Sequence, residues 1–196
     1  EVWIDTRKGL NTPQALPASV LAAFAEDTTP ASLNQELERA SAMCDEASDA
    51  VMRMFSEARM GRALDLSTAS TLVQAVCSSV ERHPDALISM ARLKTSDNYT
   101  YMHSVAVCGL MVALARKMEL SEAQIMQAGM AGLLHDMGKA HSDPNILNKP
   151  GALTDEEFKH MQRHQVKGFL MLQGSVQDEG VLDACLHHHE RMDGKG

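Results

Sequence analysis

Residues 131–140 read AGLLHDMGKA. The stretch begins as an apolar, helix-like run and then places two side chains that can bind a metal, His135 and Asp136, next to each other. A glycine, Gly138, and a cation, Lys139, follow directly. A helix that ends in this way predicts a helical domain with a polar site at the edge of its core. The positions of the other histidines decide what the site can do.

The composition is typical of a globular helical protein. The chain has 196 residues, of which 44% are hydrophobic, only 4% are aromatic and 14 are methionine. Unbranched apolar side chains lose little rotamer freedom in a helix, so a core of Ala, Leu, Val and Met favours helix packing. The net charge of -8 excludes a duplex nucleic acid as an expected partner, because an acidic surface repels a phosphate backbone. A phosphate-containing substrate stays compatible if metal ions supply positive charge locally.

The cysteine pattern and the apolar runs indicate the compartment. No CxxC pair occurs, and the cysteines are interpreted as reduced core thiols. The longest apolar stretch, residues 105–115, is about half as long as a membrane span. No signal peptide is visible, and because the first residue is not Met we expect an upstream segment. We therefore expect a cytoplasmic protein with no membrane span in this chain; its cysteines are Cys44, Cys77, Cys108 and Cys185.

The chain divides into a short leading part and a long helical part. Residues 2–5 (VWID) favour a β-strand, and residues 9–30, with three prolines, favour a linker with one short helix over 19–25. From Ser32 onward the apolar spacing is helical. We therefore expect the end of an N-terminal domain, with a strand remnant and linker, over 1–29. An all-α helical bundle is expected over 30–196.

Start signals define the individual helices. Three capping boxes are predicted, at Ser32 with Gln35, Ser121 with Gln124, and Thr154 with Glu157. Two further helices are expected to begin at Ser67 or Thr68 and at Ser96 or Asp97, and residues 138–153 are expected to form a loop. The predicted helices cover residues 33–60, 68–83, 85–94, 97–118, 122–135, 155–173 and 178–190.

Histidines recur on four successive predicted helices. His103, His135 and His164 each lie on a different helix, and the run 187–189 closes the last one. In a helix bundle, ligands from facing helices converge in the core. A single histidine in a helix is more often a hydrogen-bonded core or surface residue, and this reading applies to His83 and His141.

The ligand types indicate which metals would fit. Imidazole and carboxylate together suit Fe, Mn, Zn, Co or Ni better than Ca or Mg. No cysteine is expected near these positions, so a closed structural zinc site is not expected. His160 and His164 are four residues apart and could suggest zinc, but the HExxH context is absent. Because five or six histidines exceed what one catalytic metal needs, the pattern favours a two-metal site.

Five blocks in the second half of the chain carry a resemblance to a known family. In order they are YTYMHSVAV (99–107), LLHDMGKA (133–140), ILNKPGALTDEEF (146–158), a histidine at 164 with a glycine at 168, and HHERMDGKG (188–196). They resemble the HD-GYP family of metal-dependent phosphodiesterases, a branch of the HD superfamily. The resemblance covers residues 97–196. It implies a helical bundle of the HD-GYP type that continues beyond Gly196 with Tyr-Pro and a further metal-binding Asp.

The resemblance assigns roles to individual residues. It implies that Asp136 bridges two divalent metal ions, with Fe or Mn first and Ni, Co or Zn as alternatives. Lys139 would contact substrate phosphate and complete the catalytic pair with Asp136. Tyr99 stands where members with three metals carry Glu, which favours two metals here. His187 has no role in the family. The implied metal ligands are His103, His135, Asp136, His164, His188 and His189.

The activity that the resemblance implies is hydrolysis of cyclic di-GMP to the linear dinucleotide, to GMP, or to both. Mixed cyclic GMP-AMP is an alternative substrate, and a catalytically silent dinucleotide sensor is an alternative function. An HD hydrolase acting on (p)ppGpp or dNTPs is disfavoured by the HHE-DG-G block. The implied partners are a cyclic dinucleotide and signalling proteins that bind the GYP region. The long helix over 32–60 could also serve as the surface of a homodimer.

Overall fold

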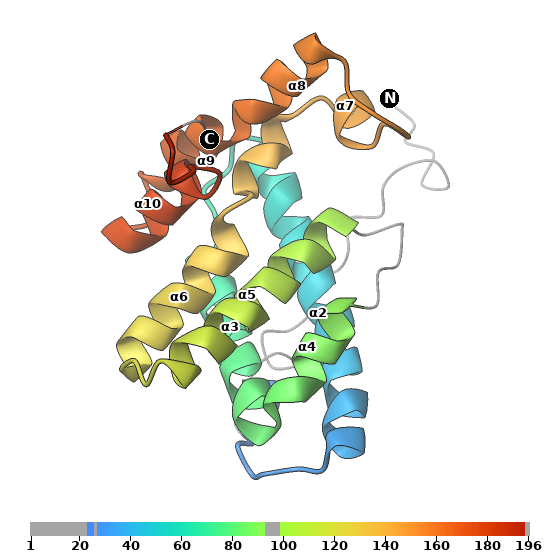
Figure 1. Ribbon diagram of the computed structural model, residues 1–196, viewed down its shortest axis with the longest axis vertical. Helices are drawn as coiled ribbons and strands as arrows, with labels where there is room; N and C mark the ends of the chain where they lie inside the picture. Colours follow the sequence, from blue (N-terminus) through green and yellow to red (C-terminus); the bar gives the residue numbers. More distant parts are fainter. Residues whose placement is uncertain (1–22, 26, 93–98, 195–196) are drawn as a thin grey trace, which may run out of the picture.

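The computed structural model describes residues 23–25, 27–92 and 99–194, and these residues form helices and contain no strand. None of their helices is long and apolar enough to span a membrane. The predicted strand at 2–5 and the predicted cap at 96–97 lie outside the described residues. The helices, shown in Figure 1, are α2 (Leu33–Arg59), α3 (Leu66–Arg82), α4 (Pro84–Arg92), α5 (Tyr99–Lys117), α6 (Glu122–Leu134), η1 (Met137–His141), α7 (Pro144–Leu147), α8 (Asp155–Gln162), α9 (His164–Leu172) and α10 (Glu179–His187).

The core lies where α2, α3, α5 and α6 pack together, and α9 and α10 join it at one end (Figure 1). Its side chains are mostly Ala, Val, Leu and Met, as the composition predicts. Among the described aromatic residues, the rings of Phe55 and Tyr101 meet edge to face with centroids 5.3 Å apart. All the cysteines are buried and unpaired, which confirms them as core thiols.

Local capping sets most helix starts. The predicted boxes at Ser32, Ser121 and Thr154 are confirmed, each with its reciprocal side-chain and backbone contacts. The predicted start of α3 at residue 67 or 68 is wrong. Asp65 caps this helix instead, since its carboxylate accepts from the backbone N–H groups of both of those residues.

The single helix predicted over 155–173 is also wrong, because the chain breaks at Arg163 into α8 and α9. No residue of α8 is buried, whereas α9 packs its backbone directly against η1. A Cβ on Gly138 would overlap the carbonyl oxygen of His164 and come within 2.5 Å of the nitrogen of Gly168. The direction of α9 is therefore fixed by contact with η1, which local sequence does not encode.

A buried ion pair ties the start of α2 to the end of α3. Glu36, fully buried, accepts from Arg82 Nε at 2.6 Å and from Ser79 Oγ at 2.7 Å. The guanidinium of Arg82 also donates to the carbonyl oxygens of Phe24 and Asp27. The pair therefore anchors the segment that precedes α2.

At its other end, α2 contacts η1, the segment that directly follows His135 and Asp136. Arg59 Nε donates to the carbonyl oxygen of Ala140 in η1 at 3.1 Å. The predicted loop over 138–153 is thus partly ordered, into η1 and the short α7. The inner face of α2 packs against α3, α4, α5 and η1. A homodimer surface on this helix stays a prediction and would have to use its exposed face.

Candidate metal centre

Asp136 lies at the point where three helix ends and one helix face converge. It follows α6 directly and precedes η1, and its residue is 1% exposed. It makes no capping hydrogen bond to the backbone of η1, so its carboxylate is directed toward the surrounding side chains. Five imidazole rings and one ammonium group surround this carboxylate, and the two oxygens face different groups.

The oxygen Oδ2 faces α5 and the end of α6. Nε2 of His135 lies 3.2 Å away and Nε2 of His103 lies 3.7 Å away. Together with Asp136 these two histidines form a group whose ligand atoms all lie within 4.8 Å of one another, which could hold a metal ion. The α5 backbone presents His103 from its second turn, while His135 is the C-cap of α6.

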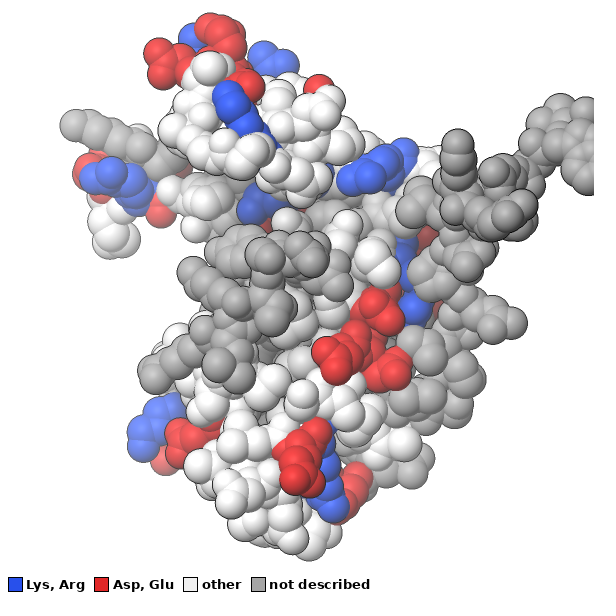
Figure 2. Space-filling model, turned by 90° about the vertical axis from the view of Figure 1, so that its right-hand side faces the viewer, with Lys and Arg blue, Asp and Glu red and all other residues white. Residues whose placement is uncertain are grey.

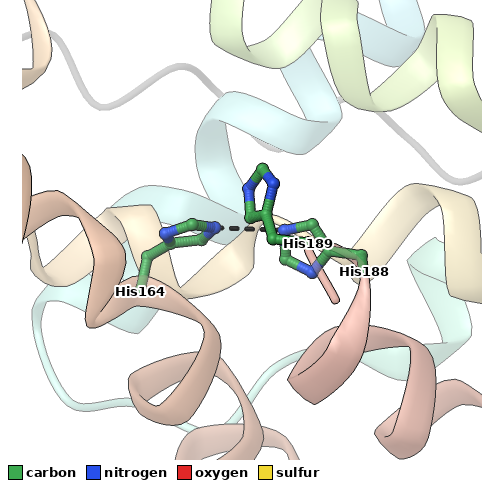
Figure 3. A group of neighbouring side chains, drawn as sticks. All are labelled: His164, His188 and His189. Atoms are coloured by element: carbon green, nitrogen blue, oxygen red, sulfur yellow. Dashed lines mark hydrogen bonds between the residues drawn. The ribbon is translucent and has the colours of Figure 1, made fainter. Parts of the chain in front are cut away.

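The oxygen Oδ1 faces α9 and the end of α10. Nε2 of His164 lies 3.3 Å away and Nε2 of His188 lies 3.6 Å away. These two rings and His189 form a second group with the spacing of a metal site, and Figure 3 shows their nitrogens directed into a common space. Asp136 Oδ1 is buried and has no hydrogen-bond partner among the described residues.

Three of the rings are held in the same way. Nδ1 of His135, His164 and His188 lies 2.8, 2.7 and 3.0 Å from a carbonyl oxygen three residues earlier in the chain. A carbonyl oxygen only accepts, so Nδ1 carries the proton and donates. In a neutral imidazole the other nitrogen, Nε2, then presents a lone pair. Anchoring of this kind is usual for histidines that bind metals.

The resulting arrangement concentrates electron pairs at the centre of the site. Nε2 of His164 and Nε2 of His188 are 3.1 Å apart, and both face an oxygen of Asp136. Such atoms repel each other unless protons or metal cations lie between them. The ammonium group of Lys139, 2.6 Å from Oδ2, stabilises the carboxylate form of Asp136. The donor set therefore fits metal cations held between Asp136 and the surrounding rings.

The remaining two rings also favour the neutral form. Burial lowers the pKa of His103, although the charge of Asp136 partly opposes this. Burial likewise lowers the pKa of His189, and the neighbouring His188 and His164 rings lower it further. Neutral imidazole is the form that binds a metal, so both side chains are ready to act as ligands at neutral pH.

Lys139 completes the polar centre from η1. Its Nζ lies 2.6 Å from Oδ2 of Asp136, and its side chain is 22% exposed. The ammonium group therefore lies between the buried carboxylate and solvent, at the rim where an anionic substrate would approach. The structure thus brings together all seven predicted site residues: His103, His135, Asp136, Lys139, His164, His188 and His189.

Other histidines lie away from this centre. His83 is the C-cap of α3, His141 is exposed, and Nδ1 of His187 lies 3.0 Å from the carboxylate of Asp183 on the surface of α10. Asp193 lies in the turn after α10 and pairs with Arg191. None of these side chains belongs to either histidine group, as expected for His83, His141 and His187.

Two contributions to the site were not predicted. The first is Cys185, whose buried Sγ lies 3.4 Å from the carbonyl oxygen of His135, so the expectation of no cysteine near the ligands is wrong. The second is the role of Gly138, which was interpreted as a bend after the helix. Its φ is not positive, and it serves close packing against α9 instead. Sequence offered one signal for Cys185, its position three residues before His188.

The face of the molecule shown in Figure 2 carries charges of both signs. Figure 2 shows Lys and Arg in small separate groups among Asp and Glu, and no continuous basic band crosses the described residues of this face. The whole chain carries a net charge of -8. Attraction for a phosphate group must therefore come from within the site.

Comparison with known families places this fold and site in a class. Residues 74–196 match the HD domain, and residues 1–69 match a domain of unknown function, DUF3391. The chain belongs to the HD domain family, and its relatives confirm the resemblance to the HD-GYP branch. The predicted boundary between domains near residue 30 stays a prediction. No solved structure matches the chain.

Several curated proteins are similar to this chain. The cyclic di-GMP phosphodiesterase PA4108 of Pseudomonas aeruginosa is 52% identical over 100% of this chain, which covers 49% of that protein. The response regulator RpfG of Xanthomonas campestris, a cyclic di-GMP phosphodiesterase, is 35% identical over 74% of this chain and 39% of its own length. A 3'3'-cGAMP-specific phosphodiesterase of Vibrio cholerae is 32% identical over 57% of this chain and 26% of its own length. The chain thus spans about half or less of these relatives.

Proposed function

We propose that this chain is the metal-binding catalytic part of a phosphodiesterase that hydrolyses cyclic di-GMP to the linear dinucleotide, GMP or both. The observation that carries the proposal is Asp136, a buried carboxylate with one oxygen facing each of two histidine groups. The 52% identity to a cyclic di-GMP phosphodiesterase supports this substrate over mixed cyclic GMP-AMP, whose relative is 32% identical over a shorter stretch.

The proposed ligand sets follow the two oxygens of Asp136. His103, His135 and Oδ2 would hold one divalent ion, and His164, His188, His189 and Oδ1 would hold the other. Imidazole and carboxylate donors suit Fe or Mn, with Ni, Co and Zn as alternatives. Ions held in this way would supply a water molecule of lowered pKa and positive charge beside the reacting phosphate.

The residues of the chain prepare the site for this chemistry. The backbone anchors hold the three rings of His135, His164 and His188 in fixed orientations, so little reorganisation is needed when ligands bind. Lys139 is proposed to contact the substrate phosphate, because its ammonium group lies at the partly exposed rim of the site. There it would stabilise charge that develops on the phosphoryl oxygens.

Partners and localisation follow the same proposal. The substrate is a cyclic dinucleotide, and the compartment is the cytoplasm. Signalling proteins would bind near residues 188–196, which correspond to the GYP region of the family. The turn after α10 supports this last point, since residues 189–194 are exposed and carry charges of both signs.

Direct assay of the intact protein tests the proposal. The protein is purified without oxygen, its metals are counted by elemental analysis, and it is incubated with cyclic di-GMP, mixed cyclic GMP-AMP and ppGpp. We expect about two metal ions per chain and release of the linear dinucleotide or GMP from cyclic di-GMP. Tight binding of cyclic di-GMP by a metal-loaded sample without turnover would instead indicate a sensor. Fewer than about one metal per chain would contradict the site.

A further inference from the structure

Cys185 is the one buried cysteine among the described residues that contacts both histidine groups. Its Sγ lies 3.4 Å from the carbonyl oxygen of His135, a member of the first group. Its own carbonyl oxygen accepts from Nδ1 of His188, a member of the second group, at 3.0 Å. One residue of α10 thus links a ligand at the end of α6 to a ligand at the end of its own helix.

The same side chain also packs against the helix that carries His164. A Cβ on Gly168, one turn after that histidine, would come within 2.8 Å of the Sγ of Cys185. The thiol therefore occupies space that is left free because residue 168 is glycine. Three helix segments, the end of α6, the first turns of α9 and the last turn of α10, meet at this sulfur atom.

The chemistry of the contact is that of a donor and not of a metal ligand. A thiol carries one weak S–H donor, and Cys185 directs it to the His135 carbonyl oxygen. The sulfur belongs to neither group of possible ligand atoms, so it acts on the site only through the histidines.

We infer that Cys185 is a positioning residue that fixes the separation between the two metal sites. This inference rests on the proposed function. The contact to His135 fixes the position of the first group relative to α10. The contact to His188 orients a ring of the second group at the end of the same helix. Loss of the S–H donor should let the end of α10 shift relative to α6 and carry His188 with it, so both sites loosen together. Loss of a single ligand would weaken mainly its own site.

The test compares two substitutions of similar size in the intact protein. Cys185→Val removes the donor, and Cys185→Ser keeps one. Cys44→Ala, at a cysteine that is also buried but lies in α2, controls for the loss of a core thiol. Calorimetry measures the affinity for Mn²⁺. Electron paramagnetic resonance measures the magnetic coupling between the two manganese ions, which depends on their distance. Thermal unfolding shows whether each variant is folded.

We expect Cys185→Val to weaken binding at both sites by roughly 10-fold, in the range that contacts behind metal ligands contribute, and to alter the manganese coupling. Cys185→Ser should retain most of the affinity and the coupling, and Cys44→Ala should retain all of it. Wild-type affinity and coupling in Cys185→Val would overturn the inference, as would an equal loss in Cys44→Ala. If the wild-type protein binds no Mn²⁺, the proposed function itself fails, which is a distinct result.

Discussion

Among the described residues, two carboxylate side chains are buried, and their surroundings differ. Glu36 is 0% exposed and Asp136 is 1% exposed. The carboxylate of Glu36 receives hydrogen bonds from Arg82 and Ser79, which satisfy its charge and its lone pairs. Asp136 receives one hydrogen bond from Lys139, and its other oxygen faces imidazole nitrogens.

The difference shows that burial of a charge does not by itself indicate a functional site. A buried carboxylate that is matched by donors links parts of the fold, as Glu36 does. A buried carboxylate that also faces further electron-pair donors, as Asp136 does beside Lys139, can share added cations with those donors. The following predictions separate these two cases.

The largest effect is expected for Asp136→Ala. Both proposed sites lose a shared ligand, so metal affinity should fall by more than the roughly 10- to 100-fold that contacts behind the ligands contribute. Phosphodiesterase activity should disappear. Elemental analysis and the cyclic di-GMP assay measure the two effects, and full metal content in this variant would contradict the bridging role.

The corresponding change at the other carboxylate, Glu36→Gln, should affect stability and not catalysis. Arg82 would stay buried without its counter-charge, and breaking such a pair typically costs about 3–5 kcal/mol. Urea unfolding measures this loss. Activity per folded molecule should equal that of the wild type below the unfolding transition, and a specific loss of metal would show that the two regions are not separate.

Lys139→Ala should lower turnover and leave metal content nearly unchanged, because an ammonium group cannot bind a cation. The expected loss is roughly 10²- to 10³-fold in kcat, the value for one group that stabilises developing charge. Lys167→Ala is a matched control, since this lysine donates to the carbonyl oxygen of His141, the last residue of η1, and is not part of the centre. Full turnover in the metal-loaded Lys139→Ala variant would exclude contact with the phosphate.

The smallest effect is a dependence of stability on pH in the metal-stripped protein. The pKa values of His103 and His189 lie below the ordinary value of 6.5 in the folded protein. As the pH falls below 6.5, the unfolded chain takes up protons that the folded protein does not, so stability decreases. Tm measured at pH 7.5 and 5.5 should differ less in a variant with both histidines replaced by Gln. An equal difference in the two proteins would contradict these shifts.

The sequence predicted best the features that depend on neighbouring residues. The capping boxes of α2, α6 and α8 were correct because the groups that form each box lie three residues apart. The division between α8 and α9 was not predictable in this way. It depends on contact between Gly138 and Gly168, which are distant in sequence and whose lack of a side chain gives no periodic signal.

The same distinction applies to the site. The members of the two histidine groups were predictable because side chains that bind metals are recognisable in a sequence, and the structure brings them together. Their metal roles stay a proposal. The carbonyl oxygens that orient the rings were not predictable, since every residue has one, and the contact from Cys185 to His135 involves such an oxygen.

The arm formed by α7 and α8 has a consequence for how the protein can open. No residue of either helix is buried. The main packing partners of α8 are its neighbours in the chain, α7 and α9. A segment that contributes nothing to the core can open without unfolding the rest, so its amide hydrogens should exchange earlier than those of α2 or α6. Met161, near the end of α8, holds the ring of His164 through its carbonyl oxygen, so opening of the arm would also release one of the proposed metal ligands.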